Sequence, residues 1–195
     1  MTASDIHSET LSRLAPLRRE ALSPERQADY DALTRAPGGL NLAGLKGPGG
    51  VWMRLPALRK PMGEVNRILR SESGLDPRLI EVAILAAARE MDSQFEWTMH
   101  EPVALEKGVA RQTIEVIRHR RELTGVPQDE AALIRLAREG IGKHTVGSDS
   151  YARAVEIFGE EKLLQYATLL ACYAMTAIML AVVDQQLPEG KRSLL

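Results

Sequence analysis

The spacing of apolar residues constrains the fold of this chain more than any other feature of its sequence. From Val51 onward, apolar residues recur every three or four positions, as in the series Leu58, Met62, Val65 and Leu69. That interval places them on one face of an α-helix. The alternation typical of a half-buried β-strand is not sustained for six residues at any point. The sequence therefore predicts an all-α fold, a compact multi-helix domain.

Capping and breaker residues divide this pattern into separate helices. Ser23 followed by Pro24 is a start signal for a helix in the N-terminal arm. Residues 35–50 contain six glycines and two prolines, which predicts a loop. No GxxxxGK[ST] phosphate-binding pattern occurs there, so we expect an ordered loop that covers a pocket. After this loop we expect one helix that begins at Pro77. Six further helices are expected at residues 58–71, 93–107, 110–121, 127–143, 148–158 and 160–183.

These elements suggest three parts. Residues 1–50 form the N-terminal arm and the loop, residues 51–190 form the helical domain, and residues 191–195 form a C-terminal tail. The helix at 160–183 is apolar nearly all round, so it must be covered on every side. A domain of this size covers such a helix only in part, which predicts that a second copy of the chain shares its surface.

Charge and composition exclude several classes of partner. The 26 acidic and 25 basic residues give a formal net charge of -1, which provides no field to attract nucleic acid or an anionic membrane. The longest apolar stretch, residues 169–183, falls short of the roughly twenty residues of a membrane span. Residues 1–17 lack the apolar core of a signal peptide. We therefore expect a soluble, cytoplasmic protein with no nucleic-acid or membrane partner.

Cys172 is the only cysteine. One thiol can neither close an intramolecular disulfide nor form a zinc-binding cluster. The chain therefore cannot be a two-cysteine redox enzyme. A weak thiol-dependent peroxidase that works through Cys172 alone is the least favoured interpretation, because apolar surroundings make a thiol a poor nucleophile.

Three titratable residues in apolar surroundings are the candidates for catalysis. Glu96 and His100 are four residues apart, so on a helix they share one face and can reach each other. Glu81 lies in the apolar segment 79–85, on the preceding helix. In this hypothesis His100 transfers a proton. Glu96 orients the imidazole of His100 and favours its charged form, and Glu81 holds the pair or acts as a second acid.

The same residues admit two other interpretations. A Glu–His pair is common on solvated helix surfaces, and a lone Glu in an apolar helix often forms a salt bridge, here with Arg78 or Arg89. A metal site is disfavoured because di-iron helices use the spacing i,i+3, and His119 and His144 lie outside the cluster. We predict no metal and no cofactor.

The segment 75–109 resembles the core of the carboxymuconolactone decarboxylase and alkylhydroperoxidase D-like family. Redox members of that family carry Glu, then Cys-x-x-Cys, then His at fixed intervals. Here Glu81 and His100 are separated by the same interval as the Glu and His of that pattern, and Ser93 and Glu96 occupy the positions of the two cysteines. A cysteine-free branch of the family carries further segments that are matched here at residues 95–102, 173–175 and 187–190.

The resemblance covers roughly residues 23–190 and implies an alkylhydroperoxidase D-like helical fold that assembles into homotrimers or hexamers. It does not imply peroxidase chemistry, which needs an attacking thiolate and a resolving thiol. With the residues above, it favours an acid/base enzyme, a lyase or isomerase that decarboxylates, isomerises or processes a lactone. Its substrate is expected to be a small carbonyl compound or carboxylic acid.

In this interpretation Ser93, Trp97 and Tyr173 contribute to the substrate site. Two carboxylates would repel an anionic substrate unless an arginine enters the pocket, and the candidates are Arg54, Arg70 and Arg89. The alternative is a non-catalytic member of the family that binds a small molecule or a partner protein.

Overall fold

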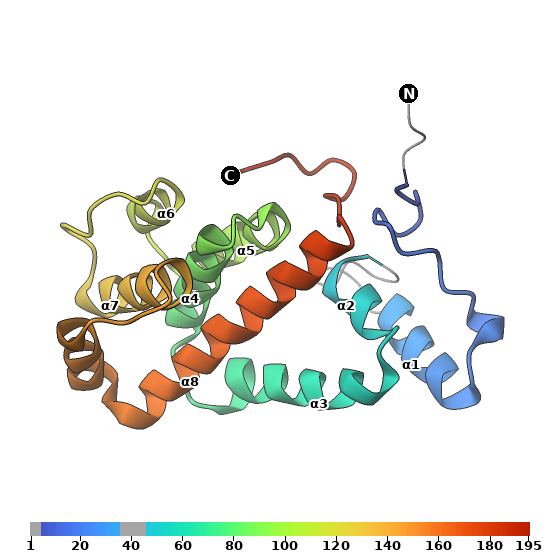
Figure 1. Ribbon diagram of the computed structural model, residues 1–195, viewed down its shortest axis with the longest axis horizontal. Coiled ribbons are helices and arrows are strands. Elements are labelled where there is room, and N and C mark those ends of the chain that lie inside the picture. The colour runs from blue at the N-terminus through green and yellow to red at the C-terminus, as the bar shows by residue number, and fades with distance from the viewer. Residues whose placement is uncertain (1–4, 36–45) are drawn as a thin grey trace. The chain divides into compact units, whose positions relative to one another are not determined.

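The computed structural model describes residues 5–35 and 46–195 of the chain. Within these residues every regular element is a helix, and the only β-type pairing is an isolated bridge between His7 and Ser12. The all-α prediction is therefore confirmed. Figure 1 labels the α-helices in chain order: α1 Pro24–Arg35, α2 Gly47–Trp52, α3 Pro56–Arg67, α4 Pro77–Glu90, α5 Gln94–Glu106, α6 Arg111–Arg118, α7 Gln128–Ala137 and α8 Ser148–Val182.

The chain divides into two compact units. One lies within residues 1–64 and 178–192, and the other comprises residues 65–177 and 193–195. All six residues predicted for the active site belong to the second unit. The predicted boundaries at residues 50 and 190 stay a prediction.

In the first unit, the predicted loop is wrong at its C-terminal end, because Gly47 to Gly50 form the first turn of α2. Pro48 suits this turn, since a proline at the start of a helix lacks only an N–H that would be unpaired. A Cβ atom on Gly49 would lie 3.1 Å from Cδ1 of Leu33, so a larger residue would crowd this packing. Residues 36–45, including most of the predicted loop, lie outside the described residues.

In the second unit, α4 is the central helix. Ten successive residues from Leu79 to Ala88 are buried, and the helix packs against α5, α6 and α7. Its start follows the expected chemistry: the Asp76 side chain accepts a hydrogen bond of 2.8 Å from the backbone N–H of Arg78. Helix α4 is thus covered by the other helices of this unit along most of its length.

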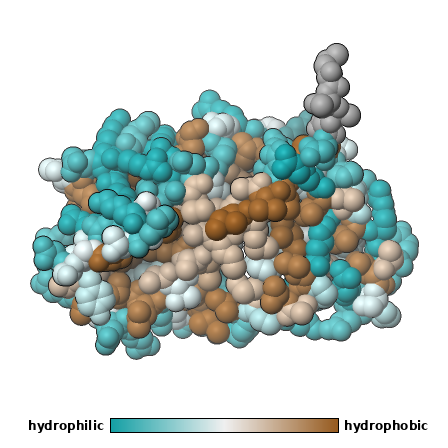
Figure 2. All heavy atoms as spheres, viewed as in Figure 1, coloured by the Kyte–Doolittle hydropathy of each residue, from teal (hydrophilic) through white to brown (hydrophobic). Residues whose placement is uncertain are grey.

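The last helix, α8, is interrupted at Gly159, where the predicted segments 148–158 and 160–183 meet (Figure 1). Gly159 has φ 73° and ψ 162°, a backbone conformation essentially restricted to glycine. Beyond it, Leu163, Tyr166 and Leu169 face the core, while Leu164 is 60% exposed. Figure 2 shows apolar atoms gathered along α8 on the viewed face.

By length and composition, α8 is also the one helix among the described residues that could cross a membrane, a test that core helices of soluble proteins pass as well.

Two widened turns follow regular helices. Residues Ile68–Glu72 (η2) extend α3, and residues Arg138–Gly142 (η3) extend α7, both as π-helix. In η2 the backbone N–H of Ser73 donates to the carbonyl of Ile68 five residues earlier, at 2.8 Å. The sequence predicted ordinary helix here, because both segments keep an apolar periodicity. A π turn changes the direction in which the side chains project, and this matters for Arg70.

Candidate acid/base site

Glu81, Glu96 and His100 form one cluster in the second unit. All three are nearly inaccessible to solvent, with exposures of 2%, 3% and 4%. Nδ1 of His100 lies 2.7 Å from Oε2 of Glu81, a hydrogen bond between α5 and α4. On the other side of the ring, Nε2 lies 3.7 Å from Oε2 of Glu96, beyond hydrogen-bond distance. The imidazole therefore stands between two carboxyl groups.

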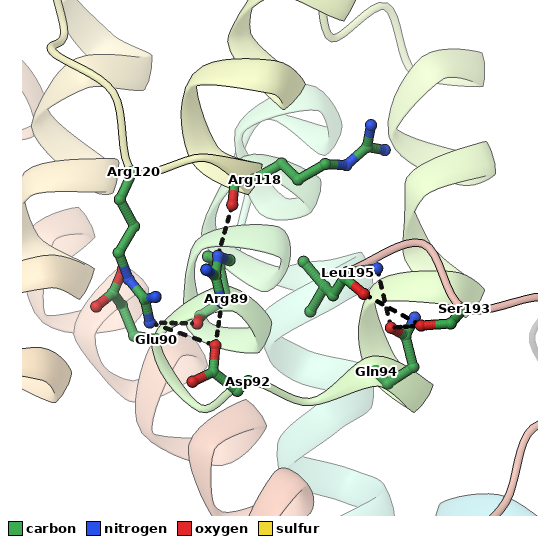
Figure 3. Close-up of polar contacts among 8 residues, drawn as sticks. All are labelled: Arg89, Glu90, Asp92, Gln94, Arg118, Arg120, Ser193 and Leu195. Carbon is green, nitrogen blue, oxygen red and sulfur yellow. Dashed lines mark hydrogen bonds and ion pairs between the residues drawn. The ribbon is translucent and has the colours of Figure 1, made fainter.

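The turn between α4 and α5 sets the positions of these residues. Asp92 adopts φ 49°, and the N–H of Ser93 closes the turn on the carbonyl of Ala88 at 2.8 Å. Figure 3 shows how the end of α4 is then fixed: Nε of Arg89 donates to the Arg118 carbonyl at 2.6 Å, and Nη2 of Arg120 donates to the Arg89 carbonyl at 2.9 Å. These contacts tie the C-terminal end of α4 to α6 and to Arg120, next to the turn that leads into α5.

The start of α5 is fixed by a second set of contacts, also drawn in Figure 3. Oε1 of Gln94 accepts hydrogen bonds from the Ser193 hydroxyl and from the backbone N–H of Leu195, the latter at 2.9 Å. The amide nitrogen of Gln94 donates to the Thr98 hydroxyl at 2.6 Å. Residues 193–195 therefore pack against the helix that carries Glu96 and His100.

The geometry exchanges the roles that the sequence suggested for the two carboxylates. Glu81, rather than Glu96, makes the hydrogen bond that orients His100. Burial raises the pKa of the Glu96 carboxyl, opposed by His100 and Arg70 and reinforced by the charge of Glu81. Glu96 is therefore suited to carry a proton, and Glu81 to hold the ring.

Of the three candidate arginines, Arg70 is the one at the cluster. Its Nη2 lies 3.4 Å from Oε1 of Glu81. Arg54 belongs to the first unit and donates to the Gly50 carbonyl at 2.6 Å, and Arg89 is engaged at the end of α4. Sequence alone did not choose between them.

Tyr173 of α8, predicted to contribute to the substrate site, lies beside the cluster. Its ring meets the imidazole of His100 edge-on, with centroids 5.2 Å apart and an angle of 87°. Burial raises the pKa of its hydroxyl, so Tyr173 stays a neutral hydrogen-bond donor at ordinary pH.

The other two predicted substrate residues are placed differently. Trp97 is completely buried, its indole N–H donates to Oε2 of Glu101 at 2.6 Å, and Arg118 stacks over its ring at 5.5 Å. Ser93 is the N-cap of α5, without a capping hydrogen bond from its side chain. Among the described residues, no polar contact joins either side chain to His100, and we interpret Trp97 as part of the core.

The second unit contains another buried carboxylate that the sequence analysis missed. Glu130 is 2% exposed and accepts a hydrogen bond of 2.6 Å from the Thr113 hydroxyl. It also pairs with Arg78, whose other nitrogen lies 2.6 Å from Asp129. Arg78 was a predicted partner of Glu81, and this second cluster shows why it is not available. All partners of Glu130 are present, which favours a structural role.

A groove of about 670 Å³ lies between α7, η3 and the beginning of α8. Its lining residues include Leu123, Arg135, Arg138, Lys143 and Arg153, and none belongs to the Glu–His cluster. In the described part of the chain, no group of three or more His, Cys, Asp or Glu side chains is arranged to hold a metal ion.

Comparison with known proteins gives a family match over part of the chain and a similar fold. The model of the carboxymuconolactone decarboxylase family matches residues 56–139, which include Glu81, Glu96 and His100. No curated protein matches the sequence.

Several solved structures are similar in fold. A peroxidase-related protein from Ralstonia eutropha with an alkylhydroperoxidase AhpD core has a TM-score of 0.71 at 12% identity, covering 92% of this chain and 93% of that chain. The debrominase Bmp8 has a TM-score of 0.69 at 14% identity, covering 92% of both chains. A protein of unknown function from Agrobacterium tumefaciens, suggested to be the antioxidant defence protein AhpD, has a TM-score of 0.62 at 19% identity over 68% of this chain and 92% of that chain.

Proposed function

Residues 56–139 of the chain match the carboxymuconolactone decarboxylase family model, and from this premise we propose that the protein is an acid/base enzyme of that family. The reaction we propose is the decarboxylation, isomerisation or lactone processing of a small carbonyl or carboxylic acid substrate. The observation that carries the proposal is the imidazole of His100 held between two buried carboxyl groups of unequal character.

The hydrogen bond to Glu81 defines which nitrogen of His100 does the chemistry. Because a carboxylate only accepts hydrogen bonds, Nδ1 carries the proton in this contact. In the neutral ring Nε2 then has a free lone pair, and it faces Glu96 across 3.7 Å. Because burial also raises the pKa of Glu96, a candidate base and a candidate acid stand side by side.

This pair supports proton transfer at carbon. In an isomerisation, Nε2 of His100 removes a proton next to a carbonyl group, and the protonated Glu96 carboxyl returns one at another position. In a decarboxylation, the electrons of the broken C–C bond remain on carbon when CO₂ leaves, and Glu96 supplies the proton that replaces it. Either use contributes roughly 10²- to 10⁴-fold in rate.

Solvent exchange tests the proposal whichever way the reaction runs. Small keto acids and lactones are incubated with the protein in D₂O, and C–D formation and CO₂ release are followed by NMR. We expect deuterium incorporation into at least one compound, and its loss in His100→Gln. His119→Gln, at the exposed histidine that caps the C-terminal end of α6, is the matched control and should keep the activity. Equal incorporation by His100→Gln and the unaltered protein would contradict the assignment.

A second candidate is a non-catalytic member that binds a small molecule or a partner. The near-complete burial of all three residues favours it, because a closed ion-pair cluster needs no substrate. The same exchange experiment separates the two: a binding module incorporates no deuterium into any compound, with or without His100.

A thiol peroxidase is the weakest candidate. Burial raises the pKa of the lone Cys172 thiol, which keeps it in the less nucleophilic protonated form. We expect no peroxide consumption with a thiol reductant, and no change in Cys172→Ser.

We further propose a cytoplasmic homo-oligomer, a trimer or hexamer. The apolar side of α8 supports an assembly, since Leu164 is 60% exposed and Ala167 and Ala171 beside it are also exposed. Analytical ultracentrifugation that finds only monomer at high micromolar concentration would contradict this.

A further inference from the structure

Arg70 is the one member of the Glu–His cluster that reaches solvent. Its side chain is 30% exposed, whereas the side chains of Glu81, Glu96 and His100 are at most 5% exposed. A molecule that approaches these groups from solvent therefore meets the guanidinium of Arg70 as the accessible charge of the site.

The guanidinium still has hydrogen bonds to give. Its contact with Glu81 is long, at 3.4 Å, and it uses one nitrogen. Within the residues that the structure describes, no second polar contact to this side chain is found. A guanidinium has five N–H donors in a planar fork, which match the two oxygens of a carboxylate.

The π turn η2 places this side chain. Leu69 is buried and Ser71 is exposed, so Arg70 lies between the core and the surface. The charge of Arg70 acts on both Glu96 and Tyr173, opposing the rise in pKa that burial causes at each. The guanidinium is therefore directed toward the residues that flank His100.

The charges of the cluster leave room for one anion. Arg70 lies beside Glu81 and offsets its charge, and burial raises the pKa of Glu96, which favours its uncharged form. The repulsion expected from two carboxylates is then largely removed, and a donor group without a full set of partners remains at the solvent side.

We propose that Arg70 determines substrate specificity: it binds the carboxylate of a small monocarboxylic acid and so holds the neighbouring carbon near Nε2 of His100 and near Glu96. This inference rests on the proposed function, since it assigns the substrate class of the same site. The π turn is then the element of the fold that serves recognition rather than catalysis.

Binding of benzoate and of its neutral analogue benzamide tests this without any turnover. Both are titrated into the ¹⁵N-labelled protein, and the backbone amides of α5 are followed by NMR. We expect saturable shifts with benzoate and at least about tenfold weaker binding of benzamide, the usual penalty for losing a charge-assisted contact. Arg70→Gln should abolish the preference for benzoate, and Arg70→Lys should keep only part of it.

Two further variants separate recognition from folding. Exchanging neighbours in the double variant Arg70→Ser/Ser71→Arg keeps composition and net charge but turns the guanidinium away from Glu81, and should also abolish the preference. Arg111→Gln, an exposed arginine on α6, should change nothing. Circular dichroism verifies that each variant is folded.

Benzoate binding that is unaffected by Arg70→Gln and by the exchange variant would overturn the inference, as would equal binding of benzamide. The result does not depend on catalysis. If no compound incorporates deuterium while benzoate binding requires Arg70, the proposed function fails and the anion site stands. If deuterium is incorporated but benzoate binds regardless of Arg70, the proposed function stands and the role inferred for Arg70 fails.

Discussion

Glutamate precedes histidine by four residues twice in this chain, and the two pairs have opposite surroundings. Glu115 on α6 and His119, the residue that caps it, lie 3.2 Å apart, with side-chain exposures of 40% and 48%. Glu96 and His100 on α5 lie 3.7 Å apart and are at most 5% exposed. The pair with the shorter distance is the ordinary surface pair, so distance is not what distinguishes a candidate site.

The difference comes from the faces of the two helices and from one further residue. On α6 the buried positions are Thr113, Ile114, Val116 and Ile117, which leaves the Glu–His pair on the solvent side. On α5 every residue from Phe95 to His100 is buried, and Glu81 of α4 supplies a second carboxylate. The apolar surroundings and the additional carboxylate of Glu81, rather than the sequence spacing, make the buried pair suitable for acid/base chemistry.

The largest expected difference between the pairs is in rate. Glu96→Gln removes the proposed acid while preserving shape, and should lower turnover of any substrate found in the exchange screen by about 10²- to 10⁴-fold. Glu115→Gln should leave turnover unchanged. Initial rates at saturating substrate make the measurement. Equal losses in both variants would mean that the comparison does not reflect catalysis.

The next effect is on stability. Glu81→Ala leaves the Nδ1–H of His100 without its partner in a buried site, which costs about 1–3 kcal/mol. Glu115→Ala should change the free energy of unfolding by less than about 1 kcal/mol, as is usual for exposed ion pairs. Denaturant titrations of both variants provide the numbers. If Glu81→Ala left the free energy of unfolding unchanged, the buried hydrogen bond would make no net contribution to stability.

A smaller effect concerns pH. The pKa of Glu96 is raised in the folded protein, so this residue contributes stability at low pH that is lost as pH rises from the ordinary value of 4.5 through the folded pKa. Glu96→Gln removes this dependence. The stability of the variant relative to the unaltered protein should therefore grow with pH in that window, by up to about 1.4 kcal/mol per pH unit. Glu115→Gln serves as the control, and a difference that stays flat for Glu96→Gln would contradict the raised pKa.

Salt should give the smallest effect. Between 0.1 M and 1 M salt the screening length falls from about 10 Å to about 3 Å, which weakens exposed ion pairs and hardly affects buried ones. The few tenths of a kcal/mol expected from the Glu115–His119 pair should vanish at 1 M salt, as a double-mutant cycle would measure. The coupling energy of Glu81 and His100 should persist. If both couplings fall together, the buried pair is hydrated after all.

The helical fold could be predicted because its signals are local. Apolar periodicity, the Asp76-Pro77 start and the lone Gly159 that breaks α8 all act within a few residues. The glycines of α2 misled the prediction because their conformation depends on a distant contact: the N–H of Gly47 donates to Oε1 of Gln185 at 2.9 Å. Propensity is a weak prior when tertiary contacts supply the missing stabilisation.

The candidate site could be predicted in membership but not in arrangement. Carboxylates and a histidine in apolar segments identify Glu81, Glu96 and His100. Which carboxylate meets which ring nitrogen depends on the register of α4 against α5, and the turn at Asp92 that joins these helices is not apparent from the apolar pattern. The choice of Arg70 depends on the π turn, whose extra residue cannot be recognised from the spacing of the apolar residues.

The division into two units also gives the chain a built-in optical reporter. Its two tryptophans are distributed one to each unit, Trp52 in the first and Trp97 in the second. Trp97 is fully buried beside the charged Glu101 and Arg118, while Trp52 is partly exposed. Replacing Trp52 with Phe would leave a single indole whose emission follows the second unit alone, so fluorescence could tell whether the two units unfold together or in succession.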